Sequence, residues 1–336
     1  MPHADPDRAG ADVVLIGSTT LLGAEIRRRM AERRFPLRDL AMMGEGEEIG
    51  RIVDFNGEAR LVTELDPERL TRADLLILGA GGGAARRALK ALRRGLGVAI
   101  DLVGVEAAGP APVVNMEINA MALPSRRPAR VCSPHGIVQV LSTTLAAIAR
   151  KARIRAVSAT VLTPVSEHGK AGVEELYRQT MAVLSFENCR HGIFRRQVAF
   201  NAIPHGLLRD AQGGPDLDAR LQAEAAQVLG LDAEQVSIRA ILVPVFHGTS
   251  LMVNVRFSSR VKPGDLPGRL GGDAFVSGPR TPAELEGSEA IHVVGLGEQP
   301  GGQLGLWIVA DNLRCSGAGN GVRIAEALVA RSGGKE

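Results

Sequence analysis

The sequence predicts an α/β protein of two domains, a parallel-sheet domain of nucleotide-binding type followed by an α+β domain. Over the first hundred residues, short apolar runs alternate with amphipathic helical stretches, which is typical of a parallel sheet covered by helices. From about residue 153, longer alternating stretches favour long strands in one sheet with helices on one side. The 336 residues are enough for two domains and a substantial core.

The first domain is expected to begin with a strand, a turn and a helix within 11–36. Its apolar run ends at Gly17, and Pro36 terminates the helical pattern. The same alternation continues through "DLAMMG", "ADLLILGAGGGAARRALKALRRG" and "VAIDLV". These segments predict three further strands of one parallel sheet and the helix between two of them.

In the second domain, strands are expected within 154–165, 236–257 and 303–313, and a helix over 217–229. The segment 258–289 is rich in Gly, Pro and Ser and is expected to be a loop. The last helix, about 318–332, is expected to pack back on the first domain. The predicted domains are therefore 1–134 plus 315–336, and 135–314.

Composition excludes several classes of function. The net charge of +3 comes from 40 basic and 37 acidic residues, and the arginines fall mostly on helical stretches, which favours solvated helix faces over an acidic partner. Aromatic residues make up 3%, so nucleic-acid binding is not expected. The three cysteines form no CxxC pair, which predicts neither a disulfide framework nor a zinc site and favours the cytoplasm. No apolar run has the roughly 18 residues of a membrane span.

Two glycine-rich turns are candidates for holding a pyrophosphate. "GSTTLLG" and "GAGGG" each follow an apolar strand and open a helix, where backbone N–H groups attract anions. Thr20 stands where the dinucleotide fingerprint has its middle glycine, so two tight turns kept for packing remain the alternative. The candidate cofactor-binding residues in these turns are Gly17, Thr19, Thr20, Leu21, Gly79, Gly81 and Gly82.

An acidic loop follows the second predicted strand. "GEGEEIG" places Glu45, Glu47 and Glu48 where the ribose of a dinucleotide would lie. A carboxylate there accepts hydrogen bonds from ribose hydroxyls and repels a 2′-phosphate, so NAD is favoured over NADP. An acidic surface loop is the alternative interpretation.

Segments along nearly the whole chain resemble the aspartate-semialdehyde dehydrogenase family, in the family's order. They include "IGSTTLLG", "GAGGG", "PVVNMEIN", "SPHGIV", "PVSEHGKAGVEEL", "FNAIPH", "ILVPVFHGTS" and "DNLRCSGAGNGVRIAEAL". The resemblance implies a Rossmann-like N-terminal domain, an α+β dimerisation domain and a homodimer. It also implies a bound NAD or NADP, with Asn312 among the cofactor-binding residues. The implied reaction is reductive dephosphorylation of an aspartyl phosphate through a thiohemiacetal.

Four departures from the family pattern fall on its catalytic positions. Where family members resemble "NPNCST" this chain has "SPHGIV", so the nucleophilic cysteine falls on Gly136. The family's Gln falls on Thr163, its substrate-binding Arg on Leu242 and its catalytic His on Thr249. The reaction needs a thiolate, and glycine has no side chain. The chain thus looks like the Usg-1 group of relatives that lack the cysteine, without that activity and with a regulatory or binding role.

Other side chains are weighed as substitutes for the lost groups. Cys132 is the nearest thiol, but its place at a strand end favours a buried small hydrophobe. Three histidines are also candidates: His135 and His168 fall in turns expected to border the old pocket, and His247 lies beside the position of the lost histidine. They could bind a metal or act as a base, and the alternative is that they are polar turn residues. Without HxH or HxxxH spacing, no metal is predicted. Two classes remain open: an NAD(P)-dependent oxidoreductase of altered chemistry acting on an aldehyde, and a binding subunit with an unidentified protein partner.

Overall fold

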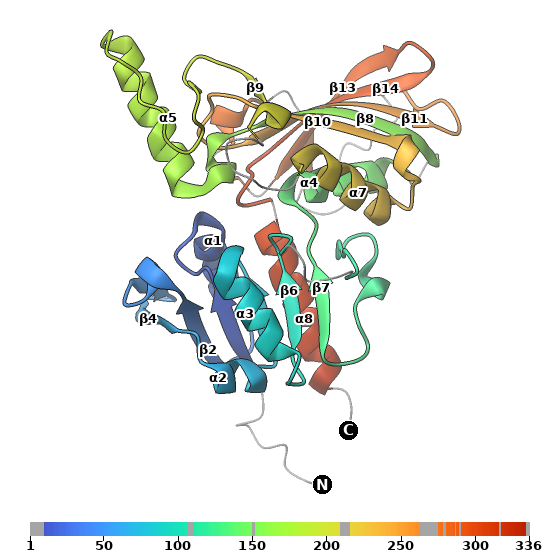
Figure 1. Cartoon of the computed structure of the whole chain (residues 1–336). Helices are drawn as coiled ribbons and strands as arrows, with labels where there is room; N and C mark the ends of the chain where they lie inside the picture. The colour runs from blue at the N-terminus through green and yellow to red at the C-terminus, as the bar shows by residue number, and fades with distance from the viewer. Residues whose placement is uncertain are drawn as a thin grey trace. The chain divides into compact units, whose positions relative to one another are not determined.

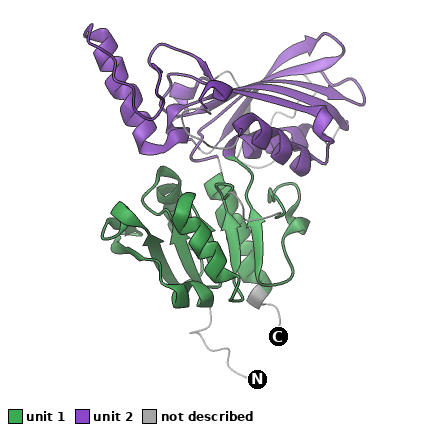
Figure 2. Ribbon diagram, viewed as in Figure 1, with its two compact units in different colours: residues 1–135, 317–336 green, residues 136–316 purple. Residues whose placement is uncertain are grey.

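The chain divides into two compact units, which are described separately below (Figure 2). Unit 1 comprises Met1–His135 and Gly317–Glu336, and unit 2 comprises Gly136–Ser316. The computed structural model describes residues 10–105, 111–149, 152–208, 216–262, 275–277, 280–285, 287–288, 290–315 and 317–333. Across those residues, no helix combines the length and the apolar character that a membrane crossing requires.

Unit 1 is built on a seven-stranded sheet of order β3-β4-β2-β1-β5-β6-β7, which is parallel except for the β3–β4 pair (Figure 1). The strands are β1 (Ala11–Ile16), β2 (Leu37–Gly44), β3 (Ile52–Phe55), β4 (Glu58–Glu64), β5 (Leu75–Leu78), β6 (Val98–Asp101) and β7 (Ala129–Cys132). The helices are α1 (Leu21–Glu32), α2 (Pro67–Arg72), α3 (Gly82–Leu92) and α8 (Gly317–Gly333).

Helices cover both faces of this sheet, as expected for a Rossmann-like domain. Along β1, Val13 and Leu15 share a core with α1 and α8, whereas Val14 and Ile16 share a second core with α2 and α3. The two-residue period of a strand sends successive side chains to opposite faces, so a continuous apolar run is buried on both. The predicted α/β fold with a Rossmann-like first domain is confirmed.

The hairpin of β3 and β4 lies outside the predicted strands and makes the sheet mixed at one edge. Its two-residue turn is Asn56-Gly57, with φ of 55° and 82°. Positive φ at both central positions is typical of a type I′ turn, for which Asn-Gly is the preferred pair. That dipeptide is the sequence signal that would have predicted the hairpin.

Unit 2 contains a second seven-stranded sheet, of order β12-β13-β14-β11-β8-β10-β9. The strands are β8 (Ile154–Thr163), β9 (Ile203–Pro204), β10 (Val236–Leu242), β11 (Thr249–Phe257), β12 (Phe275–Ser277), β13 (Ile291–Gln299) and β14 (Gln303–Ala310). The helices are α4 (Gly136–Ala149), α5 (Gly169–Leu184) and α7 (Leu217–Leu229). Side chains of α4 and α7 share one apolar core with the sheet, while α5 projects from it (Figure 1).

Two strands of unit 2 correct the prediction from sequence. The segment 258–289, expected as a loop, contains the short strand β12, and much of the rest of it lies outside the described residues. β13 was not predicted either, although it pairs along β14. Gly295 and Gly297 interrupt its apolar alternation, and the pairing register shifts between them. The helix over 217–229 is confirmed.

Candidate functional site

The two glycine-rich turns of unit 1 lie side by side, after the neighbouring strands β1 and β5. Gly17 has φ of +79°, and a Cβ added there would lie 2.4 Å from the Cβ of Ala80 in the other turn. A Cβ on Gly23 would lie 2.1 Å from the carbonyl oxygen of Gly17. β2 and β5 flank β1 on opposite sides, so this is the point at which the strand order reverses. Ligands of open α/β sheets bind at such points.

Thr20 closes the first turn as the N-cap of α1. Its Oγ1 accepts a hydrogen bond from the N–H of Gly23 at 2.9 Å and lies 2.8 Å from the carbonyl oxygen of Gly17. It also lies 3.2 Å from the carbonyl oxygen of Gly79 in the second turn. Threonine thus satisfies a helix donor and links the turns, which explains its place where the fingerprint has glycine.

Open space and a buried hydroxyl group without a hydrogen-bond partner among the described residues lie beside these turns. A Cβ on Gly81 or on Gly82 would meet no atom within 4 Å, so their backbone is open to a ligand. The Oγ of Ser18 is buried and has no hydrogen-bond partner among the described residues. Buried polar atoms are normally paired, so this hydroxyl indicates room for a polar group. The residues here fit a dinucleotide phosphate held at the start of α1.

The acidic loop after β2 reaches both turns. The Glu45 carboxylate accepts a hydrogen bond from the N–H of Ala84 at 2.9 Å, in the first turn of α3, and forms an ion pair with Arg87. Chiefly because of the Ala84 hydrogen bond, the pKa of Glu45 is lowered from its ordinary value. Glu48 accepts a hydrogen bond from the Thr19 hydroxyl. Glu45 therefore occupies the N-terminus of α3, which leaves the start of α1 for a ligand anion.

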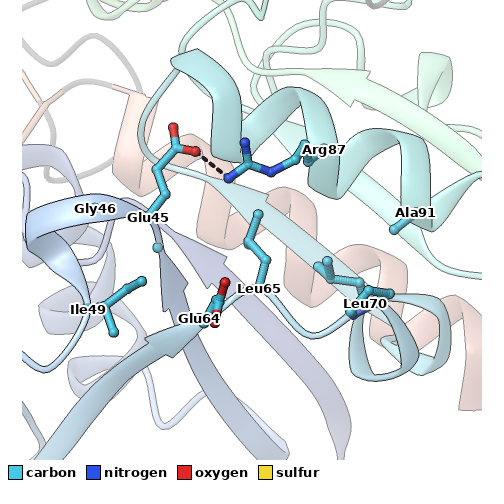
Figure 3. Close-up of a pocket in the computed structure, with 10 residues that line it drawn as sticks. Glu45, Gly46, Ile49, Glu64, Leu65, Leu70, Arg87 and Ala91 are labelled. Atoms are coloured by element: carbon cyan, nitrogen blue, oxygen red, sulfur yellow. Dashed lines mark hydrogen bonds and ion pairs between the residues drawn. The ribbon is translucent and has the colours of Figure 1, made fainter.

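A cavity of about 580 Å³ lies beside Glu45 and Arg87, at the carboxyl ends of β2 and β4 (Figure 3). Its charged lining residues are Glu45, Glu64 and Arg87, and its apolar ones include Ile49, Leu65, Leu70 and Ala91. A volume of this size with an apolar wall and few polar groups is typical of small-molecule sites. The sequence did not predict this cavity, because its lining comes from four separate elements.

In unit 2, three of the positions that the family resemblance implies to be catalytic lie at one end of the sheet. Thr163 ends β8, Leu242 ends the parallel strand β10 directly opposite it, and Thr249 begins the antiparallel strand β11. Their exposed fractions are 0%, 0% and 2%. All three side chains are therefore buried.

Leu242 lies in an apolar cluster at this end of the sheet. The cluster also contains Val165, Leu176, Phe194, Val198, Ala199, Ile203 and Leu208. Phe194 is fully buried and is contributed by the segment after α5. A guanidinium group at position 242 would be surrounded by these hydrocarbon side chains, where an unpaired charge is strongly disfavoured.

Thr163 is engaged with a histidine that the sequence analysis did not single out. Its Oγ1 lies 2.8 Å from Nε2 of His205, whose ring stacks on His168 with centroids 5.7 Å apart. The edge of His168 packs on Phe194, with a centroid distance of 4.9 Å. Desolvation lowers the pKa of both histidines to about 4. At neutral pH both rings are thus uncharged parts of the packing.

Asn312, predicted as a cofactor contact, makes its hydrogen bonds inside unit 2. Its Oδ1 accepts from the N–H of Gly248 at 2.9 Å, and its Nδ2 donates to Oγ of Ser166 at 3.0 Å and to Oε1 of Glu167 at 3.3 Å. Burial raises the pKa of Glu167 to about 7. Glu167 was also missed from sequence, although it stands inside the quoted "PVSEHGKAGVEEL" segment.

The remaining candidates include residues of the segment that leads from β7 into α4. Gly136 is the first residue of α4, and His135 precedes it half-buried. Cys132 ends β7 half-buried, its N–H bonded to the carbonyl oxygen of Pro112 at 2.8 Å. Within the described ranges, no group of three His, Cys, Asp or Glu side chains is arranged to hold a metal ion.

A Rossmann-like unit with paired glycine-rich turns, followed by a sheet covered by helices on one face, defines a dehydrogenase-type two-domain protein. The family model "Semialdehyde dehydrogenase, dimerisation domain" matches residues 145–315. The chain belongs to the aspartate-semialdehyde dehydrogenase family, which includes the Usg-1 homologues.

Relatives of both names cover nearly the whole chain. A USG-1 protein homolog from Azotobacter vinelandii is 30% identical over 95% of this chain and 97% of its own length. An aspartate-semialdehyde dehydrogenase from Rickettsia bellii is 28% identical over the same shares. The aspartate semialdehyde dehydrogenase II structure from Vibrio cholerae has a TM-score of 0.83 at 25% identity, covering 96% of this chain and 99% of that one. A Candida albicans enzyme solved with NADP shares the fold, with a TM-score of 0.72 at 15% identity over 96% and 99%.

Proposed function

We propose that this protein is a dinucleotide-binding homodimer that does not catalyse the aspartate-semialdehyde reaction and has a binding or regulatory role. One observation carries the proposal: Thr163, Leu242 and Thr249 are buried inside unit 2, while the first residue of α4 is Gly136. Covalent catalysis needs a nucleophile, an acid or base and a clamp for the substrate carboxylate. In this chain Gly136 provides no nucleophile, Thr249 stands at the position of the acid or base, and Leu242 stands at the position of the carboxylate clamp.

Neighbouring side chains supply no replacement thiolate. Cys132 belongs to the last pair of β6 with β7, four residues before Gly136, and its backbone is fixed on both sides by hydrogen bonds to 112–114. Loss of a nucleophile costs several orders of magnitude in rate even when the rest of a site is intact. His168 and His205 are neutral and packed together, so they do not form the charged partner that lowers a thiol pKa.

The cofactor in this proposal is NAD in preference to NADP. The cavity beside β2 has two carboxylates, Glu45 and Glu64, against one guanidinium, Arg87, which is already paired with Glu45. A 2′-phosphate in this cavity would be repelled, because the cavity lining carries a net negative charge. A ribose hydroxyl, in contrast, would find carboxylate acceptors there. The open glycines and the Ser18 hydroxyl support the pyrophosphate end of the same ligand.

A second candidate function is favoured by Glu167. With a pKa of about 7, its carboxyl group exchanges protons readily at neutral pH, which suits a general acid or base. An NAD-dependent oxidoreductase that acts on an aldehyde without a covalent intermediate would use such a group. Turnover lost in Glu167→Gln would support this candidate over the binding role.

The homodimer is supported by apolar side chains that unit 2 leaves exposed. On α5 and just after it these are Tyr177, Met181, Leu184 and Phe186, and on the open face of the sheet Met252 and Leu296. Each is between 44% and 99% exposed, and large exposed apolar groups gathered on one domain mark interaction sites. Light scattering during size-exclusion chromatography at micromolar concentration should give a dimer. A monomer would contradict the dimer, and a second bound polypeptide would favour a hetero-partner.

Calorimetric titration with NAD, NADH, NADP and NADPH tests the cofactor, and a coupled assay with aspartate semialdehyde and phosphate tests the reaction. The proposal expects NAD binding in the micromolar range, weaker NADP binding and no turnover. No binding of any form would make the glycine-rich turns packing elements only. Turnover at a rate typical of enzymes would overturn the proposal.

A further inference from the structure

A second, larger cavity lies in unit 1 at the opposite end of the parallel strands from the glycine-rich turns. Its volume is about 1150 Å³. It is lined by Thr71, Arg72, Ala73, Asp74, Gly95, Leu96, Pro124, Ser125, Arg126, Arg127, Leu328 and Arg331. These residues come from the end of α2, from the loops that lead into β5, β6 and β7 and from the last turns of α8. This arginine cavity is independent of the proposed dinucleotide site.

The wall of the arginine cavity is held by close backbone contacts. A Cβ on Gly95 would lie 2.0 Å from the carbonyl oxygen of Thr71, and one on Gly97 would lie 2.2 Å from that of Ala73. Only glycine permits loops to approach so closely. Asp74 is fixed as well, because its carboxylate accepts a hydrogen bond from the N–H of Asp12 at 2.9 Å. The cavity is thus a formed part of the domain.

Positive charge dominates the lining. The lining contains Arg72, Arg126, Arg127 and Arg331 against a single acidic residue, Asp74, whose carboxylate also accepts a hydrogen bond from Arg38 at 3.0 Å. Arg72 forms an ion pair with Glu68 at 2.5 Å, outside the lining, and the lining itself carries more positive than negative charge. An anion in the cavity would therefore be attracted by charge and by geometry.

Fold stability accounts for only part of this cluster. Arg72 and Arg331 lie in the last turns of α2 and α8, where cations stabilise a helix C-terminus, and Arg331 donates to the carbonyl oxygen of Leu123 at 3.3 Å. Arg126 and Arg127 belong to no helix and are exposed in the loop before β7. Arg126 forms no ion pair within the described part of the chain. A ligand anion would give the exposed Arg126 a partner.

We propose that the arginine cavity binds a phosphorylated small molecule with an apolar or flat organic body, such as a nucleoside diphosphate. Guanidinium groups match phosphate oxygens in charge and in paired hydrogen-bond geometry. Leu96, which is 74% exposed, lies beside Pro124 and Leu328 in the same lining and supplies an apolar wall for the rest of the molecule. A volume of about 1150 Å³ accommodates a ligand of this size. The arginine cavity would thus bind a phosphorylated metabolite at the end of the sheet opposite the proposed dinucleotide site.

The test is calorimetric titration of the full chain with ADP and with pyrophosphate in 150 mM NaCl, where weak surface attraction is screened. Wild-type protein should bind ADP more tightly than pyrophosphate, because only ADP also contacts the apolar wall. The double variant Arg126→Gln/Arg127→Gln should raise the Kd for ADP at least tenfold. Arg331→Gln serves as a second variant from a different element, should the loop variant fold poorly.

Two controls separate this site from the others. Arg195→Gln/Arg196→Gln removes the same charge from an exposed segment of unit 2 and should leave ADP binding unchanged. Arg87→Gln alters the cavity near the glycine-rich turns; with the proposed dinucleotide site saturated by NAD, it should leave the Kd for ADP unchanged. Loss of binding only in Arg87→Gln, equal binding in all variants, or no binding by the wild type at millimolar ADP would overturn the proposal. Tighter binding of a single-stranded RNA 20-mer than of ADP, lost in the same loop variant, would also overturn it.

Discussion

The strand ends near the glycine-rich turns of unit 1 and the strand ends around Thr163 in unit 2 differ in one respect. In unit 1, Gly81 and Gly82 adjoin open space and the Ser18 hydroxyl lacks a partner among the described residues. In unit 2, Thr163 and Leu242 are completely inaccessible and the cluster around Leu242 is filled with hydrocarbon, although the buried Thr249 hydroxyl, like that of Ser18, has no partner among the described residues. One family fold thus keeps room for a ligand at one site while it closes the other with its own side chains.

That difference shows why family membership does not decide function. The backbone that presents the ends of β8, β10 and β11 is retained, with Leu242 paired opposite Thr163. Function depends on which side chains stand at those ends, and in our proposal Thr163 and Leu242 serve packing there. Variants at the two sites test whether the first is open to a ligand and the second is filled by side chains.

The largest effect is expected for Leu242→Arg. Restoring the family's residue type would place a charge inside an apolar cluster with 0% exposure, and we expect the free energy of unfolding to fall by more than ~4 kcal/mol. Urea denaturation measures this. Leu207→Arg, at a site 51% exposed, is the matched control and should change stability by no more than ~0.5 kcal/mol. A well-tolerated arginine at position 242 would mean that the site is open.

The packed histidines predict an acid-sensitive fold. His168 and His205 have pKa values of about 4 in the folded protein, below the ordinary 6.5, so the unfolded chain takes up protons first as the pH falls. Their contribution is fully present above pH 6.5 and is lost as the pH falls toward 4, by on the order of 3 kcal/mol for each ring. His205→Gln, which keeps a partner for Thr163, should flatten this dependence in denaturation curves measured across pH 4–7. The exposed His191→Gln should not, and equal slopes in both variants would contradict the buried, neutral ring.

Glu167 should change the stability of the fold with pH in the opposite direction to the histidines. Its pKa of about 7 lies above the ordinary 4.5, so the unfolded chain loses the proton first, and stability falls as the pH rises from 4.5 through 7. Glu167→Gln keeps a neutral acceptor for Asn312 and should remove that fall. The effect should be similar in size to that of His205, because the two pKa values depart from their ordinary values by about the same amount. A variant whose stability still declines over this range would place the titration elsewhere.

A smaller effect is expected on cofactor choice. Glu45→Gln/Glu64→Gln removes both carboxylates from the cavity beside Arg87, and we expect the affinity for NADP relative to NAD to rise about tenfold, or ~1.4 kcal/mol. Competitive calorimetry with the two dinucleotides measures the ratio. Glu47→Gln removes one carboxylate that is 95% exposed and not in the lining; it is the control and should leave the ratio unchanged. An unchanged ratio in the double variant would mean that these carboxylates do not face the ribose.

Local pattern was sufficient to predict much of the fold, because apolar runs buried on both faces of the first sheet are unambiguous. β1 and β5 are of this kind, and Gly17 directly follows the first strand, whereas the first helix ends at Glu32, four residues before Pro36. The β12–β13 pair was missed because glycine interrupts β13 and β12 has only three residues. At the site, the positions of Gly136 and Leu242 came from the family pattern. The partners of Thr163 did not, because His205 reaches it across 42 residues of chain and only the folded backbone brings them together.

The central claim is that the chemistry was lost with the whole site and not with one residue. The most direct test is the coupled assay with aspartate semialdehyde, phosphate and NAD or NADP on the Gly136→Cys variant, beside a family member that has the cysteine. A thiol at the start of α4 would gain the helix N-terminus, but Leu242 and Thr249 would still lack the carboxylate clamp and the acid or base. The account predicts no turnover above the rate without enzyme. Appreciable turnover in this single variant would contradict it and show that the other positions retain catalytic competence.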